Sequence, residues 1–480
     1  MNRRGIHGVG LVPPVMMGGN FDEAYLLRDD FLDTLAAGSV NGTRATPGGI
    51  GGVALNTRNV VDVSGDGLSL SGGLASFANP SAVSGDPGLW YGAITRARGR
   101  VMLCKVNYTS VAQLSFCGFD TDQTGGMGSN SFTQRSSGFW SWQVGNVNMS
   151  PYVITTNYIL AIVLRVTGAY LFVKGGVYTN FTLMPAFETN AAATLYPCIE
   201  TNSSVYTVDF VRIPVVCWLP TPLASDGMSS ATLTDGLGHA EGITGGIGAG
   251  GGNVPWATAA TWAVAGGVAL NTPVLGGELA VGNLVVGTWY SITATQVNYF
   301  YVGCAIGDSF RATAATGLDA FNKVKAFTTA ELVRPLNTSF TADVIAQVKA
   351  VAMTARTHSG LAIRLNDPTT PTSGILAYFD KGSITVVEFS GATYTQLFTA
   401  VKAFTASDSL QLIADDVNVR LIHLTSAGVA TLIGSTAVAT ITTGGYHGLF
   451  STDSGNTLDN LVIYSRGTDN SYSILDRWSK

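Results

Sequence analysis

Charged side chains are so scarce in this chain of 480 residues that long surface helices are disfavoured. Only seven glutamates occur, and charged residues together make up 12% of the chain, which is about half of the usual share. A surface helix needs Glu, Lys, Arg and Gln on the face that meets water. The 58 glycines, together with many Thr, Ser, Val and Ala residues, favour short strands joined by tight turns. The sequence therefore predicts an all-β protein.

One heptapeptide, Gly-Gly-Val-Ala-Leu-Asn-Thr, occurs at residues 51–57 and again at 266–272, 215 residues later. An identical segment at that separation indicates a duplicated unit of the size of a large β-domain. The alternative is coincidence in a chain rich in Gly, Ala and Thr. The two copies lead to similar unit ends, at 205–212 and 458–466, which favours duplication. We interpret the heptapeptide as a mark of equivalent early positions in two domains.

The pattern of apolar runs and turn residues divides the chain into six segments. We expect an N-terminal arm (1–28), a first β-sandwich (29–215), a linker (216–232), a second β-sandwich (233–273 and 333–466), a small β-module inserted in it (274–332) and a C-terminal tail (467–480). Each sandwich then has the length of one large β-domain.

Two local patterns support strands. Residues 159–166 and 170–174 are separated by Thr-Gly-Ala, which predicts a hairpin. Residues 342–352 alternate between Ala or Val and more polar residues, which is typical of a strand. A helix is the competing interpretation of that segment, because Ala, Gln and Lys are good helix formers. We favour the strand, since further strand-like runs follow almost without pause.

The charge, apolar-run and cysteine patterns bear on the partners and the compartment of the protein. The net charge is −5 and Lys and Arg are scattered, so no basic stripe for nucleic acid is expected. No run of eighteen apolar residues predicts a membrane span, and the apolar stretch after Arg3 and Arg4 is too interrupted for a signal peptide. The five cysteines lack CxxC spacing, which predicts free thiols in a protein folded in a reducing cytosol.

The strand blocks of the second half resemble a known family. Blocks at 359–365, 375–380, 410–415, 417–424 and 458–463, opened by Asp235-Gly236 and residues 261–267, resemble the concanavalin A-like (LamG-like) jelly-roll domains of bacteriophage virion structural proteins. The first unit, from Asp29-Asp30-Phe31, is similar but more diverged. The insert, with residues 287–290 and 307–310, looks like a short module common in phage structural and tail proteins.

This resemblance implies two jelly-roll β-sandwiches with a small β-module inserted in the second. It also implies a structural protein of the virion, assembled in the host cytoplasm, as a capsid decoration, a head fibre, or a tail fibre or spike component. Such a protein acts through contacts with other virion proteins and forms a homo-oligomer, for which a trimer is the expectation. The alternative is a receptor-recognition protein that binds host-surface glycans, or a polysaccharide depolymerase of the tail.

The sequence predicts no enzyme. Glycosidases need a pair of carboxylates, and the Glu-x-Asp-x-x-Glu pattern of laminarinase-like families is absent. Apart from Glu23 in the arm, the glutamates lie at 188, 200, 241, 278, 331 and 388, each isolated from other acids in the chain. The five histidines stand alone, and no Gly-x-Ser-x-Gly motif occurs. His423, between two apolar residues of a strand, is expected to be structural.

The remaining candidate sites are for binding. Asp120 and Asp122 form an alternating acidic pair beside Gly125-Gly126, as in a calcium-binding or sugar-contacting loop; the alternative is a solvated turn. No other cofactor is expected. Trp140 and Trp142 share one strand face, where rings about 7 Å apart could stack on successive sugar rings. The alternative for both tryptophans is the sandwich core. Tyr299 and Tyr301 in the insert are candidates of the same kind.

Overall fold

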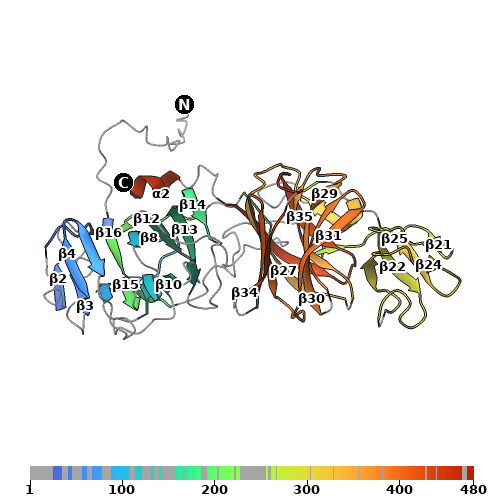
Figure 1. Cartoon of the computed structure of the whole chain (residues 1–480), viewed down its shortest axis with the longest axis horizontal. Helices are drawn as coiled ribbons and strands as arrows, with labels where there is room; N and C mark the ends of the chain where they lie inside the picture. The colour runs from blue at the N-terminus through green and yellow to red at the C-terminus, as the bar shows by residue number, and fades with distance from the viewer. Residues whose placement is uncertain are drawn as a thin grey trace, which may run out of the picture.

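The computed structural model is built almost entirely of antiparallel β-sheet, arranged as two β-sandwiches and a small module (Figure 1). It describes residues 25–34, 42–45, 57–61, 67–77, 88–108, 114–121, 131–134, 140–142, 157–165, 168–176, 178–184, 192–202, 205–220, 223–226, 256–257, 261–265, 268–302, 304–327, 329–354, 356–380, 382–426, 430–438, 440–466 and 473–479. Two short helices, α1 (Thr329–Leu332) and α2 (Ser473–Trp478), lie among them. The prediction of an all-β jelly-roll fold is confirmed.

The first sandwich packs two eight-stranded sheets face to face. In hydrogen-bonded order, one sheet consists of β14 (Tyr178–Leu183), β13 (Ala169–Gly175), β12 (Asn157–Leu164), β8 (Val101–Tyr108), β16 (Tyr206–Pro214), β5 (Leu74–Phe77) and β4 (Leu68–Ser71), with β1 (Tyr25–Asp29) also on β16. The other consists of β11 (Trp140–Trp142), β10 (Ser131–Gln134), β9 (Leu114–Asp120), β15 (Thr194–Asn202), β6 (Gly88–Tyr91), β3 (Thr57–Val61) and β2 (Gly42–Ala45), with β7 (Ile94–Thr95) also on β15. Alternate residues of both sheets fill the core between them.

The sheet that contains β13 is buried on its outer face as well. Helix α2 packs there, with Trp478 buried in the same core and the Asp476 carboxylate paired with the Lys174 ammonium (Figure 1). The second sandwich also reaches this face, where the hydroxyls of Tyr170 and Tyr464 are hydrogen-bonded at 2.9 Å. One continuous core therefore joins the two sandwiches and the C-terminal helix.

The second sandwich packs an eight-stranded sheet against a six-stranded one. The first consists of β18 (Trp262–Ala265), β19 (Val268–Asn271), β36 (Thr457–Ser465), β27 (Val344–Ala352), β32 (Ser409–Asp415), β33 (Asn418–Leu424) and β34 (Ala430–Ala437), with β17 (Ala224–Asp226) also on β36. The other consists of β26 (Val333–Pro335), β35 (Tyr446–Ser451), β28 (Ser359–Leu365), β29 (Ser373–Phe379), β30 (Ser383–Ser390) and β31 (Thr393–Val401). Strand β27 settles the choice between strand and helix for 342–352, and β12 with β13 forms the predicted hairpin.

The two sandwiches share one topology. The order β5, β16, β8, β12, β13, β14 in the first matches β19, β36, β27, β32, β33, β34 in the second. The early strands β1 and β17 occupy matching places beside β16 and β36. The similar unit ends seen in the sequence are these two long strands, so the architecture is duplicated.

The heptapeptide itself does not mark equivalent positions, and that prediction is wrong. Of the first copy, residues 51–56 lie outside the described residues, and Thr57 begins β3. Strand β3 belongs to the sheet opposite β16, whereas the second copy supplies β19, which pairs with β36. The counterpart of β19 in the first sandwich is β5. Thr57, the described residue of the first copy, therefore lies in a different sheet from the one that the second copy joins.

Three expected boundaries change in the structure. Residues 25–28, expected in the arm, form most of β1; the expected linker 216–232 contains β17; and the expected tail 467–480 contains α2. The reason is the same for both strands. Strand β5 covers β16 only at 206–208, which leaves 211–214 open to β1, and β19 covers β36 only at 457–458, which leaves 461–463 open to β17. An open strand edge offers unpaired backbone groups to any short extended segment nearby.

The inserted module lies at the end of the second sandwich away from the first (Figure 1). Its four-stranded sheet consists of β20 (Glu278–Leu279), β25 (Lys323–Ala326), β22 (Trp289–Ala294) and β23 (Ser309–Arg311), and β21 (Gly282–Asn283) pairs with β24 (Gly317–Leu318). Trp289 anchors the module, because its ring packs against His358 and Phe450 of the sandwich. The chain enters and leaves the module at one place, where the Asn271 side-chain amide donates to the Glu331 carbonyl at 2.8 Å.

Acid is expected to destabilise the second sandwich through His447, which is buried without a charge. Burial lowers the pKa of His447 to about 4, although its Nε2 donates to the Thr341 carbonyl at 3.0 Å. In the unfolded chain the imidazole of His447 takes up a proton near pH 6.5, whereas in the folded chain it does so only near pH 4. The stability that the neutral imidazole contributes is therefore present above about pH 6.5 and is lost as the pH falls toward 4. We expect His447 alone to contribute about 2 kcal/mol to the stability lost between pH 7 and pH 5 in urea unfolding.

The His447→Asn variant provides the control for this titration. Its side-chain amide retains an acceptor that can face the backbone N–H of Arg364, which donates to Nδ1 of His447 at 3.2 Å, but it does not titrate. We expect the variant to be less stable at pH 7 and to show a smaller loss between pH 7 and pH 5. An unchanged pH dependence in the variant would assign the acid sensitivity to other groups.

No helix among the described residues is long and apolar enough to cross a lipid bilayer.

Candidate functional site

A pocket of about 630 Å³ lies where the inserted module meets the second sandwich. It is lined by Tyr301, Val302, Ser309, Phe310, Arg356, His358, Asp380 and Gly382. The module supplies the first four of these residues and the sandwich supplies the other four. Its volume falls in the usual range of small-ligand sites, and neither part of the chain could form it alone.

Two aromatic rings form the wall on the module side. The rings of Tyr301 and Phe310 meet edge to face with their centroids 5.9 Å apart, and Phe310 also packs against Phe300. The Tyr301 hydroxyl donates to Oδ2 of Asp308 at 2.7 Å. Burial and this carboxylate raise the pKa of Tyr301 above its ordinary value. Tyr301 therefore stays a neutral, fixed ring at the pocket.

Charged groups of both signs lie on the sandwich side. Arg356 has a backbone φ of +59°, in the left-handed region that residues other than Gly rarely adopt. Its guanidinium lies 5.7 Å from the centre of the Tyr301 ring. The Asp380 carboxylate accepts a hydrogen bond of 3.3 Å from the Ser383 hydroxyl. The pocket thus offers N–H donors and a carboxylate acceptor beside two aromatic rings.

His358 and Ser309 also line the pocket. Ser309 Oγ lies 3.0 Å from Nδ1 of His358 and 2.7 Å from Oγ1 of Thr452. Burial lowers the pKa of His358 to about 4. The negative charge of Asp380 opposes this shift, and the positive charge of Arg311 adds to it. His358 is therefore neutral near pH 7. Ser309 is only 3% exposed, so the pair is better suited to supporting the pocket than to nucleophilic attack.

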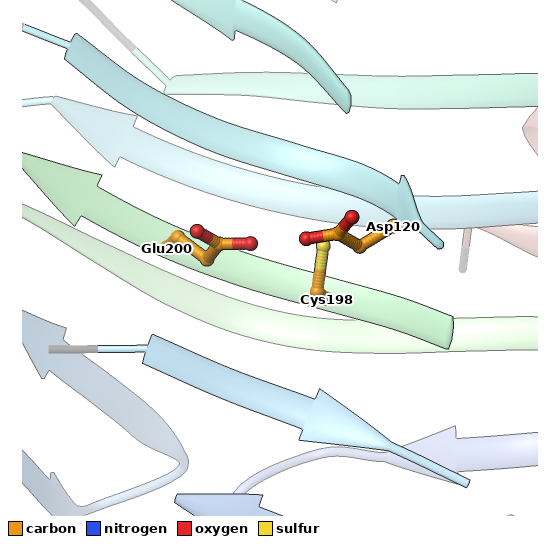
Figure 2. Close-up of side chains that lie close together, drawn as sticks. All are labelled: Asp120, Cys198 and Glu200. Carbon is orange, nitrogen blue, oxygen red and sulfur yellow. The ribbon is translucent and has the colours of Figure 1, made fainter. Parts of the chain in front are cut away.

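A second cluster lies in the first sandwich, on the sheet face opposite the core. Asp120 ends β9, and Cys198 and Glu200 lie on the neighbouring strand β15 (Figure 2). One side-chain oxygen or sulfur of each residue lies within 4.8 Å of the others, and all three residues are buried. Glu200 is isolated from other acids in the sequence, but the pairing of β9 with β15 brings it close to Asp120.

The donor atoms of this cluster do not match those that calcium prefers. Calcium takes six to eight oxygen ligands, whereas a thiolate beside two carboxylates is a softer set, closer to that of zinc. The Asp120 carboxylate also accepts the backbone N–H of Thr121 at 2.6 Å. Asp122 lies outside the described residues, so calcium at Asp120 and Asp122 stays a prediction. Because Asp120 is 0% exposed and Glu200 is 1% exposed, a sugar chain does not reach this carboxylate pair.

Of the four aromatic residues predicted to bind glycans, the structure places Tyr301 at the pocket. Tyr299 lies in the same loop but does not line the pocket; its hydroxyl donates to the Gly317 carbonyl and its ring packs against Phe300. Trp140 and Trp142 begin and end β11, where Trp142 is paired with Phe132 of β10. The side chains of both tryptophans lie outside the described part of the structure.

The sequence did not identify the partners of Tyr301 in the pocket. The sequence places Phe310 in a family-like block (307–310), and no pattern in it points to Arg356 or Asp380. One signal was available for Asp380: it follows directly on β29, at the end of a strand, where side chains often reach a sheet rim. No sequence pattern relates Arg356 to Tyr301, because the contact depends on the docking of the module.

Comparisons with solved structures find only distant similarity. No protein-family model and no curated protein sequence matches the chain. A carbohydrate-binding module from Bacillus subtilis is 11% identical over 29% of this chain and 89% of that chain, with a TM-score of 0.22. A β-1,3-glucanase from Mycobacterium marinum is 12% identical over 39% and 98%, with a TM-score of 0.23. An endo-acting O-glycanase of the human gut microbiota is 9% identical over 40% and 99%, with a TM-score of 0.27.

Proposed function

We propose that this protein binds glycans in the pocket between the inserted module and the second sandwich. The observation that carries the proposal is that the rings of Tyr301 and Phe310 share an open pocket with the side chains of Arg356 and Asp380. A pyranose ring has an apolar C–H face and a rim of hydroxyls. Aromatic rings suit the apolar face, and a few placed polar groups suit the hydroxyls.

A Tyr301→Ala variant tests the proposal. The change removes one ring of the aromatic wall, so we expect the affinity for a bound glycan to fall about tenfold, which is about 1.4 kcal/mol. Glycan-array screening identifies a ligand, and isothermal titration calorimetry measures the affinity. Tyr299→Ala is the matched control, because Tyr299 lies in the same loop outside the pocket. Equal losses in both variants, or no glycan binding by the wild-type protein, would contradict the proposal.

We propose binding without hydrolysis. Glycosidases of both stereochemical classes use two carboxylates that flank the scissile bond. Among the described residues that line the pocket, Asp380 is the carboxylate, and neighbouring Asp308 already accepts hydrogen bonds from Tyr301 and from the backbone of Ala305. The competing function is that of a polysaccharide depolymerase. Release of reducing sugars from a bound polysaccharide would favour the depolymerase.

A separate observation favours a structural role in an assembly. Nine of the fifteen strongly exposed large apolar side chains among the described residues belong to the module: Val274, Leu279, Val281, Val285, Val286, Val297, Val302, Ile306 and Phe321. Apolar surface concentrated in this way is typical of protein interaction sites. The sequence resemblance supports the bacteriophage virion as the assembly, with this chain in a decoration, fibre or spike.

Two measurements test the structural role. Sedimentation equilibrium distinguishes the expected homo-oligomer, a trimer in this proposal, from a monomer. Mass spectrometry of purified phage particles shows whether the chain is part of the virion. A compact monomer that is missing from the particles would contradict this role and leave the glycan-binding proposal untouched.

A further inference from the structure

We infer that the pocket selects sugars that carry a carboxylate, and that Arg356 is the residue that selects them. This inference rests on the proposed glycan binding and narrows it to a chemical class. A guanidinium that lines an open pocket can bind a carboxylate through two parallel N–H···O bonds. A hexuronic acid presents such a carboxylate at the rim of a pyranose ring.

The guanidinium of Arg356 has unused donors. Its recorded polar contacts are long: Nη1 lies 3.5 Å from the Val302 carbonyl and 3.8 Å from Oδ2 of Asp308. The Tyr301 hydroxyl, which donates to Asp308, is a further polar neighbour of the guanidinium. The side chain is 28% exposed. These contacts leave N–H donors of this arginine available to a ligand in the pocket.

The acid that pairs with Arg356, Asp308, lies 3.8 Å from its guanidinium. Oδ2 of Asp308 already accepts hydrogen bonds from the Tyr301 hydroxyl at 2.7 Å and from the backbone N–H of Ala305 at 2.8 Å. Asp308 therefore fixes the tyrosine and the loop while Arg356 stays 3.8 Å away. His358, the other nitrogen base at the pocket, is uncharged near pH 7 because burial lowers its pKa to about 4. Arg356 is the cation among the described lining residues.

The backbone holds Arg356 at this position although its conformation is costly. A φ of +59° costs an arginine about 1 kcal/mol, which Gly would not incur and Asn would incur less. The turn is fixed by Asn456, whose Oδ1 accepts both the backbone N–H of Thr354 at 2.9 Å and the hydroxyl of Thr357 at 2.7 Å. The Arg356 carbonyl also accepts the N–H of Ser309 at 3.0 Å. The structure thus presents an arginine at the pocket where a glycine would fit with less strain.

Asp380 defines the orientation of the sugar. Its carboxylate lines the same pocket and would repel a ligand carboxylate, but it accepts hydrogen bonds from hydroxyls. An acidic sugar would therefore place its carboxylate on Arg356, its hydroxyls toward Asp380 and its C–H face against Tyr301 and Phe310. A neutral sugar would lack the first of these contacts.

Matched sugar pairs test the inference by calorimetry. We expect the methyl glycosides of glucuronic and galacturonic acid to bind about tenfold or more tightly than those of glucose and galactose, because hydrogen bonds to ionised groups are the stronger ones. The preference should weaken with added salt. In Arg356→Gln the acidic and neutral sugars should bind with similar affinity, and Arg356→Lys should retain part of the preference. Arg356→Asn tests the same charge loss in a residue that tolerates the backbone conformation.

The controls separate the possible failures. Lys323→Gln removes a positive charge from the module away from the pocket and should leave the preference unchanged. Equal binding of acidic and neutral sugars by the wild-type protein would overturn the inference while the proposed glycan binding stands. Binding of neither class would overturn both. Acetate that binds as tightly as the glycuronides would reduce the site to a simple anion site and overturn the selection of sugars.

Discussion

An Arg58→Ala variant should lose about 3–5 kcal/mol of unfolding free energy, since the change leaves a buried carboxylate without its partner. Arg58 of β3 and Asp29 of β1 are both completely buried. Two guanidinium nitrogens of Arg58 donate to the two Asp29 oxygens at 2.5 Å, and a third donates to Asp33 at 2.7 Å. The Tyr91 hydroxyl adds a hydrogen bond of 3.0 Å to Asp29. These contacts tie β1 and β3 together across the two sheets of the first sandwich.

Urea unfolding followed by circular dichroism measures this loss. Arg28→Ala is the matched control: Arg28 pairs with Asp30, but its side chain is 37% exposed, and exposed ion pairs contribute less than about 1 kcal/mol. If both variants lose the same small amount, the buried network does not hold β1 in place.

The second large effect is expected at the C-terminal helix. Trp478 of α2 is 1% exposed in the core shared with the first sandwich, and truncation of a buried tryptophan typically costs about 3–5 kcal/mol. A six-residue helix is too short to be stable alone. We therefore expect Trp478→Ala to release α2 from the sheet and to weaken the junction of the two sandwiches.

Limited proteolysis and chemical unfolding together measure this effect. The Trp478→Ala variant should be cleaved near its C-terminus at protease concentrations that the wild-type protein resists. Asp476→Asn is the control in the same helix, because its ion pair with Lys174 is about one-third exposed and should contribute less than about 1 kcal/mol. Resistance of the Trp478→Ala variant to protease would show that α2 is held by other contacts.

The fold was predictable from the sequence because its signals are local. Alternation over 342–352 and the Thr-Gly-Ala break after 159–166 each reflect neighbouring residues, and both were interpreted correctly. Helix α2 was missed for the opposite reason. Its six residues carry little helical signal, and the groups that stabilise it, such as Lys174, lie about three hundred residues earlier in the chain.

The candidate site was predictable only in part. The sequence points to Tyr301 because an aromatic side chain is a candidate for a sugar-binding surface whatever its neighbours are. Arg356 depends on a left-handed turn held by Asn456, and such long-range support leaves no periodic pattern. The proximity of Asp120 and Glu200 depends on the register of β9 against β15, which the sequence does not specify. The sequence therefore points to single residues but not to the groups that these residues form in the folded chain.

The hydrogen bond between Asn271 and Glu331 also bears on how such a protein can change. The two ends of the module meet at this contact. The segment between them could therefore be replaced by another without a change in the length of any strand of the sandwich. Such a replacement would change the pocket residues that the module supplies and keep those that the sandwich supplies. Exchange of this segment would therefore give a descendant the same sandwich with a different pocket lining.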